Sequence, residues 1–237
     1  MDKVLFTKDN IDNLLFQLAK EYKKINRKNT PAEIVIIGGA AIVSKYGFRA
    51  STTDIDSLIF ASSSMKDAIN IVGDRNGLPT GWINENFRKT SSYTERIRQY
   101  SKHYKMFANI LEVRMLPSEY DVAMKLASLR PYKYDMSDAV GIIKTAHITR
   151  EQIENAVVDF YGGFDNLSHP NEARKLIDNI FATDNLEELY DSTRTSESDN
   201  HVILKDIDDN YPKLLSEGNL ESVLEVAKRK RDNKSKA

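Results

Sequence analysis

The sequence predicts an α/β chain of the α+β kind, in which a half built from strands and helices precedes a half built from helices alone. Two observations support this. Short apolar runs rich in β-branched residues alternate with segments of helical spacing in the first part of the chain. Beyond residue 148 only the helical spacing recurs. We therefore expect an α/β domain at residues 1–146 and a helical region at 147–237 that ends in a basic, frayed tail.

The elements follow from apolar spacing and from glycine and proline. A helix is expected where apolar side chains recur every three or four residues. The helix at 9–26 should end before Pro31, and the helix at 39–46 should end at Gly47. A strand is expected where β-branched residues cluster in a short run. The first half is expected to contain, in order, a helix at 9–26, a strand at 33–37, a helix at 39–46, a strand at 54–60, a helix at 64–72, a strand at 107–116 and helices at 119–129 and 135–143. The second half is expected to contain helices at 150–160, 171–181 and 220–229.

Composition excludes several classes of protein. The chain has 237 residues, of which 41% are hydrophobic and 29% charged, so it can build a core and a soluble surface. A net charge of −1 argues against a protein that binds nucleic acid over its whole surface. Because cysteine is absent, disulfides and thiolate metal sites are excluded. No apolar run reaches the length of a membrane helix and the start lacks a secretory apolar segment, so we expect a cytoplasmic protein.

The stretch from residue 38 to residue 56 is the most informative part of the chain. It begins with Gly38-Gly39-Ala40-Ala41 after an apolar run and ends with Thr53-Asp54-Ile55-Asp56 at the start of another. Side chains two apart on a strand share a face, so Asp54 and Asp56 can converge on one cation. Glycines allow a backbone to approach a phosphate closely, and the start of a helix favours anions. The pattern indicates metal-assisted chemistry on a nucleotide.

This spacing resembles the signature of the nucleotidyltransferase superfamily, a Gly-Gly or Gly-Ser after a strand followed by Asp-x-Asp. More narrowly, the stretch with Arg49 and Thr53 resembles the minimal bacterial nucleotidyltransferases, which include the toxins of type IV abortive-infection systems and an uncharacterised relative family. A downstream block resembles their second motif, and the tract around Pro79 and Trp82 resembles the uncharacterised relatives. The downstream block consists of Asp121, Lys125, Leu126, Ala127, Arg130, Asp135 and Asp138. The resemblance covers about residues 34–145 and extends loosely over 148–161.

The resemblance implies a nucleotidyltransferase fold, with a small mixed sheet flanked by helices, that transfers an NMP from an NTP to a hydroxyl acceptor. Mg²⁺, or Mn²⁺, is the implied metal, because carboxylates and phosphate oxygens suit hard cations. The implied metal ligands and catalytic carboxylates are Asp54, Asp56 and, from a neighbouring strand, Glu112. Lys125 is expected to contact the triphosphate as a catalytic residue. The nucleotide-binding residues are expected to be Gly38, Gly39, Ala40, Arg49, Thr53, Lys125, Asp135 and Asp138. A toxin-like role implies tRNA or another RNA as acceptor and a cognate antitoxin protein as partner.

Simpler structural explanations stand beside several of these roles. Glu112 could pair with Arg114 on an exposed strand, and Lys125 could form an i,i+4 pair with Asp121. Asp135 could cap a helix, and Asp138 could stabilise its first turn. Arg49 and Thr53 could simply tether their loop. One departure from the family pattern concerns Asp135, which follows Tyr134 where the family usually has Lys.

Two basic regions and two functional hypotheses remain. Residues 88–105 interleave basic residues with tyrosines, which is compatible either with RNA contact or with an amphipathic helix whose tyrosines enter the core. The basic run at 228–231 suits the end of a helix. The chain has no zinc-type histidine spacing, Walker loop, dinucleotide glycine pattern or nucleophile elbow. The first hypothesis is an active nucleotidyltransferase, and the alternative is a non-catalytic module that binds a nucleotide or a partner on the same fold.

Overall fold

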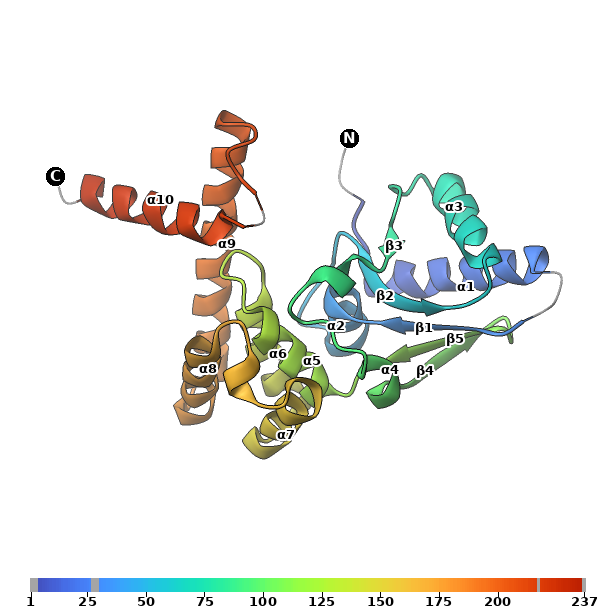
Figure 1. Ribbon diagram of the computed structural model, residues 1–237, viewed down its shortest axis with the longest axis horizontal. Helices are drawn as coiled ribbons and strands as arrows, with labels where there is room; N and C mark the ends of the chain where they lie inside the picture. The colour runs from blue at the N-terminus through green and yellow to red at the C-terminus, as the bar shows by residue number, and fades with distance from the viewer. Residues whose placement is uncertain (1–3, 27–29, 217, 236–237) are drawn as a thin grey trace.

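The computed structural model describes residues 4–26, 30–216 and 218–235. The sheet, with the helices around it, lies on one side of the molecule and α5 to α9 lie on the other (Figure 1). The first half contains α1 (Lys8–Ile25), β1 (Ala32–Ile36), α2 (Gly38–Tyr46), β2 (Ile55–Phe60), α3 (Ser64–Asn76), β3 (Ile83–Asn84), η1 (Asn86–Lys89), α4 (Ile97–Tyr100), β4 (Lys102–Phe107) and β5 (Leu111–Met115). The second half contains α5 (Ser118–Ser128), α6 (Asp135–Ala146), α7 (Arg150–Tyr161), η2 (Phe164–Asn166), α8 (Pro170–Ala182), α9 (Leu186–Asn210) and α10 (Leu220–Ser235).

The sheet has five strands in the order β3-β2-β1-β5-β4. The central strand β1 runs antiparallel to β2 and parallel to β5, so the sheet is mixed and the predicted fold class is confirmed. Ile34 and Ile36 belong to the hydrophobic cluster that also contains the apolar faces of α1 and α3. Val35 and Ile37 alternate with them and pack into a second cluster on the opposite face. Both faces of β1 are therefore buried, which explains its continuous apolar run.

Most predicted elements are confirmed within a few residues. Helix α2 ends at Gly47, which adopts the left-handed conformation with a φ of 71°, as expected for a glycine at this position. Helix α3 continues to Asn76, beyond the expected end at Val72. It can do so because Gly73 lies against the buried Trp82, whose indole N–H donates to the Ile69 carbonyl at 3.1 Å.

One prediction about elements is wrong, and one long helix is not predicted at all. The single strand expected at 107–116 is a hairpin, in which β4 and β5 pair antiparallel around a turn with positive φ at Ala108 and Asn109. The segment before the last helix forms α9, a 25-residue helix that the apolar spacing did not predict. Its sequence carries few apolar residues, and its buried positions include the polar Glu197 and Asn200.

Most helices of the second half share one hydrophobic cluster, while α10 and the second half of α9 form a small separate one. Helices α5 and α6 contribute to the shared cluster together with α7 and α8, and Ile42 of α2 joins from the sheet side. Helix α6 also packs against α9, and α10 crosses α9 and projects away from the rest of the molecule (Figure 1). The apolar packing of α5 and α6 thus continues across residue 146 into the helical region. The division of the chain at that residue stays a prediction.

The basic, tyrosine-containing region does not form one amphipathic helix. It is divided among η1, α4 and β4. Tyr100 packs against Tyr120 and Phe160, with ring centroids 4.7 and 5.5 Å away, so this tyrosine does enter the core. Arg98 donates to Glu33 at 2.8 Å and lies over the Phe60 ring. Its charge is therefore balanced within the chain, and RNA contact by this region stays a prediction.

Candidate active site

The candidate site begins where β1 passes into α2 beside the start of β2. The Ile37 N–H donates to the Asp56 carbonyl at 3.0 Å, which joins the two strands at this point. Gly38 has a φ of +63°, and a Cβ at this position would lie 3.4 Å from Asp56 Oδ2. The Asp56 carboxylate therefore lies against the first residue of α2. The first N–H groups of this helix, including that of Ala40, have no acceptor within the helix, and no side chain caps them.

Gly39 is needed for packing between α2 and the loop at 49–53. A Cβ here would lie 2.5 Å from Thr52 Oγ1 and 3.1 Å from Arg49 Nη2. Thr52 is held in turn by two backbone hydrogen bonds with Phe6, of 2.7 and 2.9 Å. The expected Thr53 is exposed beside Asp54, so the threonine that contacts the glycine pair is its neighbour Thr52.

Asp54 and Asp56 are brought together, with different exposures. Asp54 precedes β2 and is exposed, whereas Asp56 is the second residue of the strand and partly buried. Burial and the nearby Asp54 charge raise the pKa of Asp56 to about 6, while the charges of Lys125 and Arg130 oppose this rise. Asp56 of the sheet half therefore interacts electrostatically with Asp54 and with Lys125 and Arg130 of the helical half. A divalent cation would relieve the repulsion between the carboxylates.

Lys125 of α5 is held between two aspartates of α6. Its ammonium lies 3.0 Å from Asp135 Oδ1 and 2.8 Å from Asp138 Oδ2, and both carboxylates are buried. These two charges raise the pKa of Lys125 against the opposing effect of burial. The i,i+4 pair with Asp121 does not form, because Asp121 binds Lys45 at 2.6 Å. Lys125 is therefore fixed as a cation, and its charge acts on Asp56 of the sheet half.

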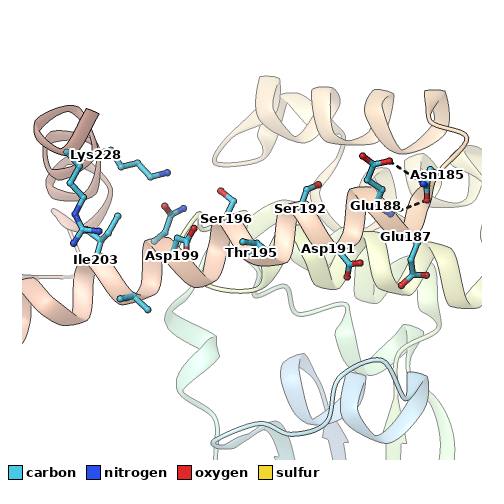
Figure 2. Close-up of a pocket in the computed structure, with 13 residues that line it drawn as sticks. Asn185, Glu187, Glu188, Asp191, Ser192, Thr195, Ser196, Asp199, Ile203 and Lys228 are labelled. Atoms are coloured by element: carbon cyan, nitrogen blue, oxygen red, sulfur yellow. Dashed lines mark hydrogen bonds between the residues drawn. The ribbon is translucent and has the colours of Figure 1, made fainter. Parts of the chain in front are cut away.

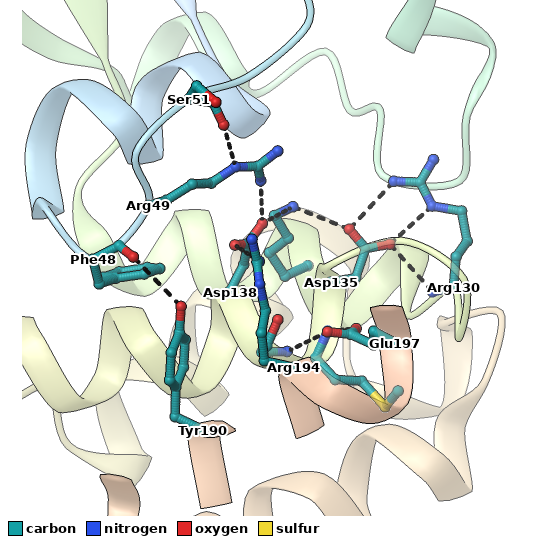
Figure 3. Close-up of polar contacts among 12 residues, drawn as sticks. Phe48, Arg49, Ser51, Arg130, Asp135, Asp138, Tyr190, Arg194 and Glu197 are labelled. Carbon is teal, nitrogen blue, oxygen red and sulfur yellow. Dashed lines mark hydrogen bonds and ion pairs between the residues drawn. The ribbon is translucent and has the colours of Figure 1, made fainter. Parts of the chain in front are cut away.

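Asp135 and Asp138 each hold a second cation. Asp135 accepts from the Arg130 side chain at 2.8 Å and from its backbone N–H at 3.2 Å. Burial alone would raise the pKa of Asp135, but Lys125 and Arg130 hold it at about 2. Asp138 accepts from Arg49 at 2.7 Å, and Arg49 also donates to the Ser51 carbonyl (Figure 3). Arg49 thus ties the loop before Asp54 to α6, while direct nucleotide contact by these residues stays a prediction.

Glu112 is not brought to this site. The register aligns Glu112 with Glu33 near the start of β1, whereas Asp56 lies beside Ile37, past the end of that strand. Along β1, the position beside Glu112 and the position beside Asp56 are four residues apart, which corresponds to about 13 Å. Glu112 instead accepts from Arg114 at 3.1 Å, as the simpler explanation proposed. Met115, the last residue of β5, pairs with Ile36, so the next residue, Leu116, is the one nearest to Ile37. This strand therefore supplies no third carboxylate.

The residues present fit a Mg²⁺ ion held by two carboxylates. The described residues contain no group of three or more histidine, aspartate or glutamate side chains able to hold a metal. Mg²⁺ is nevertheless commonly bound by one or two carboxylates together with phosphate oxygens and water. Asp56, which lies against the start of α2, and the nearby Asp54 would supply that number of protein ligands.

A groove of about 1310 Å³ runs along α9 toward α10, away from the paired aspartates (Figure 2). Its wall includes four carboxylates: Glu187, Glu188, Asp191 and Asp199. Basic side chains line it only from α10, through Lys228 and Arg231. The carboxylates along α9 disfavour the binding of a triphosphate in this groove.

The fold and the site define a class of protein. A five-stranded mixed sheet flanked by helices, with two aspartates beside a glycine turn, is consistent with a nucleotidyltransferase fold. A family model described as a nucleotidyltransferase of unknown function (DUF6036) matches residues 13–162. The match covers more than half of the chain, which belongs to this family. No curated protein and no solved structure matches it.

These findings support transferase activity and NTP binding in general terms. Among the described residues, no helix has both the length and the apolar character needed to cross a membrane.

Two side chains that contact the site network are not predicted from the sequence, Arg194 and Glu197 of α9. The sequence carries no signal for either, because both lie in a polar segment where charged residues are common.

Proposed function

We propose that the protein is a Mg²⁺- or Mn²⁺-dependent nucleotidyltransferase that moves an NMP from an NTP to a hydroxyl acceptor. The observation that carries this proposal is that the Asp56 carboxylate lies against the glycine turn and is acted on by the charges of Asp54 and the buried Lys125. In the reaction the acceptor oxygen bonds to the α-phosphorus, the bond from that phosphorus to the bridging oxygen breaks, and pyrophosphate leaves. The hydroxyl proton passes to solvent or to a nearby carboxylate.

Each group has a distinct task in this proposal. The metal, when bound to Asp54 and Asp56, would supply charge neutralisation and would activate the attacking oxygen. The first N–H groups of α2, at Gly38 and Gly39, would donate hydrogen bonds to phosphate oxygens. Lys125 would neutralise charge on the triphosphate as a point cation. Catalysis would come mainly from positioning and from electrostatic stabilisation.

The acceptor that we favour is tRNA or another RNA, in a toxin-like role with a cognate antitoxin. Support comes from the resemblance of the Gly38–Asp56 stretch and of the Lys125–Asp138 block to abortive-infection toxins. Exposed Lys89 and Lys102 in the basic region could contact an RNA backbone. The cell compartment consistent with this role is the cytoplasm.

Labelled NTPs test the proposal. Each labelled NTP is incubated with Mg²⁺ and total RNA, purified tRNA or total protein, and incorporated label and released pyrophosphate are measured. Asp54→Ala and Asp56→Ala are expected to reduce incorporation by at least about 10³-fold, because both remove a metal ligand. Asp165→Asn, on the exposed surface, is the matched control and should transfer normally.

The outcomes separate the two hypotheses. Incorporation into RNA that depends on both aspartates supports the proposal, and incorporation into protein alone would exclude the RNA acceptor. Unchanged incorporation by either aspartate variant would overturn the assignment of the site. Calorimetric binding of an NTP with no pyrophosphate release from any acceptor pool would establish the alternative, a non-catalytic binding module.

A further inference from the structure

Helix α9 contacts the candidate site although it lies outside the residues matched by the family model. Three of its side chains, spaced three residues apart, face the segment at 131–138, which leads into α6 and includes its first turn. They are Arg194, Glu197 and Asn200. Residues three apart are neighbours on the surface of a helix, so these three polar side chains form a continuous stripe on α9 that faces this segment.

Two of these contacts fasten the segment that carries the site aspartates. Glu197 is fully buried and accepts from the backbone N–H groups of Met136 at 2.8 Å and Ser137 at 3.2 Å (Figure 3). Those N–H groups belong to the first turn of α6 and have no acceptor within the helix. Asn200 donates to the Pro131 carbonyl at 2.6 Å. Glu197 and Asn200 thus hold the two ends of the segment.

Arg194 acts at the centre of the segment. Its guanidinium lies over the Tyr134 ring, 3.5 Å from the centroid, and its Nη1 is 3.8 Å from Asp138 Oδ1. Both of these atoms are buried, and neither has a hydrogen-bond partner among the described residues. The other oxygen of Asp138 is shared by Arg49 and Lys125. Arg194 therefore adds a third positive charge to Asp138, from the side that those two cations leave open.

The charge balance shows what this third cation changes. Four cations, Arg49, Lys125, Arg130 and Arg194, face Asp135 and Asp138, and the charges of Lys125 and Arg130 also act on Asp56. A lysine ammonium has three donors, and Lys125 directs two of them at these aspartates, which leaves one for a ligand. Without Arg194, Asp138 would be neutralised by one cation fewer and would attract Lys125 more strongly.

We propose that α9 completes the nucleotide site, and that Arg194 is a positioning residue that neutralises Asp138 and so keeps the Lys125 ammonium available to the triphosphate. This inference rests on the proposed function, since it assigns a role within the same site. It names a residue that acts through Asp138 and Lys125 and that does not itself touch the nucleotide.

Variants of Arg194 test the proposal. Arg194→Met keeps the length of the side chain and removes its charge, Arg194→Lys keeps the charge and alters the stacking on Tyr134, and Lys205→Met removes an exposed charge from the same helix as a control. For each, the KM and kcat for the NTP preferred by the wild type are measured by pyrophosphate release. The Kd of each NTP with Mg²⁺ is measured by calorimetry, and circular dichroism verifies folding.

Arg194→Met is expected to raise KM and Kd about tenfold with kcat within about twofold, because binding is lost equally from the ground state and the transition state. Arg194→Lys should fall between Arg194→Met and the wild type, and Lys205→Met should match the wild type. Unchanged KM and Kd in folded Arg194→Met, or a fall in kcat alone, would overturn the proposal. If Arg194→Met does not fold, the same measurements are made on Arg194→Gln, which also removes the charge, and unchanged KM and Kd in that variant overturn the proposal.

Failure of the inference and failure of the proposed function remain distinguishable. A wild-type protein that binds NTP and transfers nothing contradicts the proposed function, while the comparison of Kd values still decides the role of Arg194. A wild-type protein that transfers NMP, beside a folded Arg194→Met variant with the same kinetics, contradicts only the role of Arg194.

Discussion

Lys125 is buried as a charged residue, and only its partners make this favourable. Removing a lone ammonium from water costs several kcal/mol, and a buried pair compensates for this only when its geometry is good. Here two carboxylates lie at 3.0 and 2.8 Å, and each is held by a further arginine. The network thus fixes Lys125 in place before any ligand arrives, which is the requirement for electrostatic catalysis.

The network predicts a large loss of stability for Asp138→Asn. Asp138 is completely buried and faces three cations, so this change leaves their charges without compensation. We expect the free energy of unfolding to fall by about 3–5 kcal/mol. Urea unfolding followed by circular dichroism measures the change.

The matched control is Asp165→Asn. Asp165 pairs with Arg174 at 2.6 Å, but its side chain is 90% exposed, so its loss should cost at most about 1 kcal/mol. Equal losses for the two variants would show that the buried network contributes no more than a surface pair. A large loss for Asp138→Asn alone supports the structural account.

At the scale of elements, a helix or strand can be predicted when its apolar pattern and its end residues are visible in the sequence. Helix α2 could be predicted with its boundaries, because an apolar strand precedes it and Gly47 ends it. Strand β4 could not be predicted, because it is an edge strand in which Phe107 is the one buried residue. The turn after it places Ala108 and Asn109 in the left-handed region without any glycine to mark it.

The site was predictable only where the side chains lie close in sequence. Asp54, Asp56 and Gly38 meet because one strand end and one helix start fix them, and the resemblance added Lys125. Glu112 lies on the same face of the sheet as Asp56, but register determines the level along the strand, and register is not visible in one strand's sequence. Glu197 of α9 could not be found, because a buried glutamate in a polar helix has no distinguishing pattern.

Helix α9 gives a pH-dependent prediction through Glu197. Burial raises the pKa of Glu197 to about 7, although the N–H groups of Met136 and Ser137 oppose this rise. The folded protein therefore binds this proton more tightly than the unfolded chain, whose glutamate has its ordinary pKa of 4.5. It follows that the stability contributed by Glu197 is fully present below pH 4.5 and declines until about pH 7.

The decline attributable to Glu197 should total about 3 kcal/mol. Glu197→Gln keeps an acceptor for the first turn of α6 and removes the titration, so its free energy of unfolding should vary less between pH 4.5 and 7. Urea denaturation at half-unit pH steps measures the difference from wild type, and Glu151→Gln, on the exposed surface, is the control. A constant difference between wild type and Glu197→Gln across this range would contradict the assignment.

At the scale of the whole molecule, the candidate site is shared between two packed halves. The sheet half supplies Asp56 and the start of α2, and the helical half supplies Lys125 and Arg130. Direct links between them include the Arg49–Asp138 pair and the packing of Ile42 into the helical cluster. A nucleotide that contacts both halves would add a further link, so its binding should stabilise the whole chain against unfolding.

We therefore expect Mg²⁺ with the preferred NTP to raise the Tm. A ligand present at a hundredfold excess over its Kd stabilises a protein by about 2.7 kcal/mol. For a chain of this size, this corresponds to a rise of roughly 5–10 °C, measurable by differential scanning fluorimetry. Asp56→Asn removes a proposed metal ligand and should abolish most of the rise, whereas Asp178→Asn, whose side chain is 59% exposed on α8, should retain it. An equal rise for wild type and Asp56→Asn would place the nucleotide elsewhere, since a ligand can stabilise the protein only through contacts that the folded state provides.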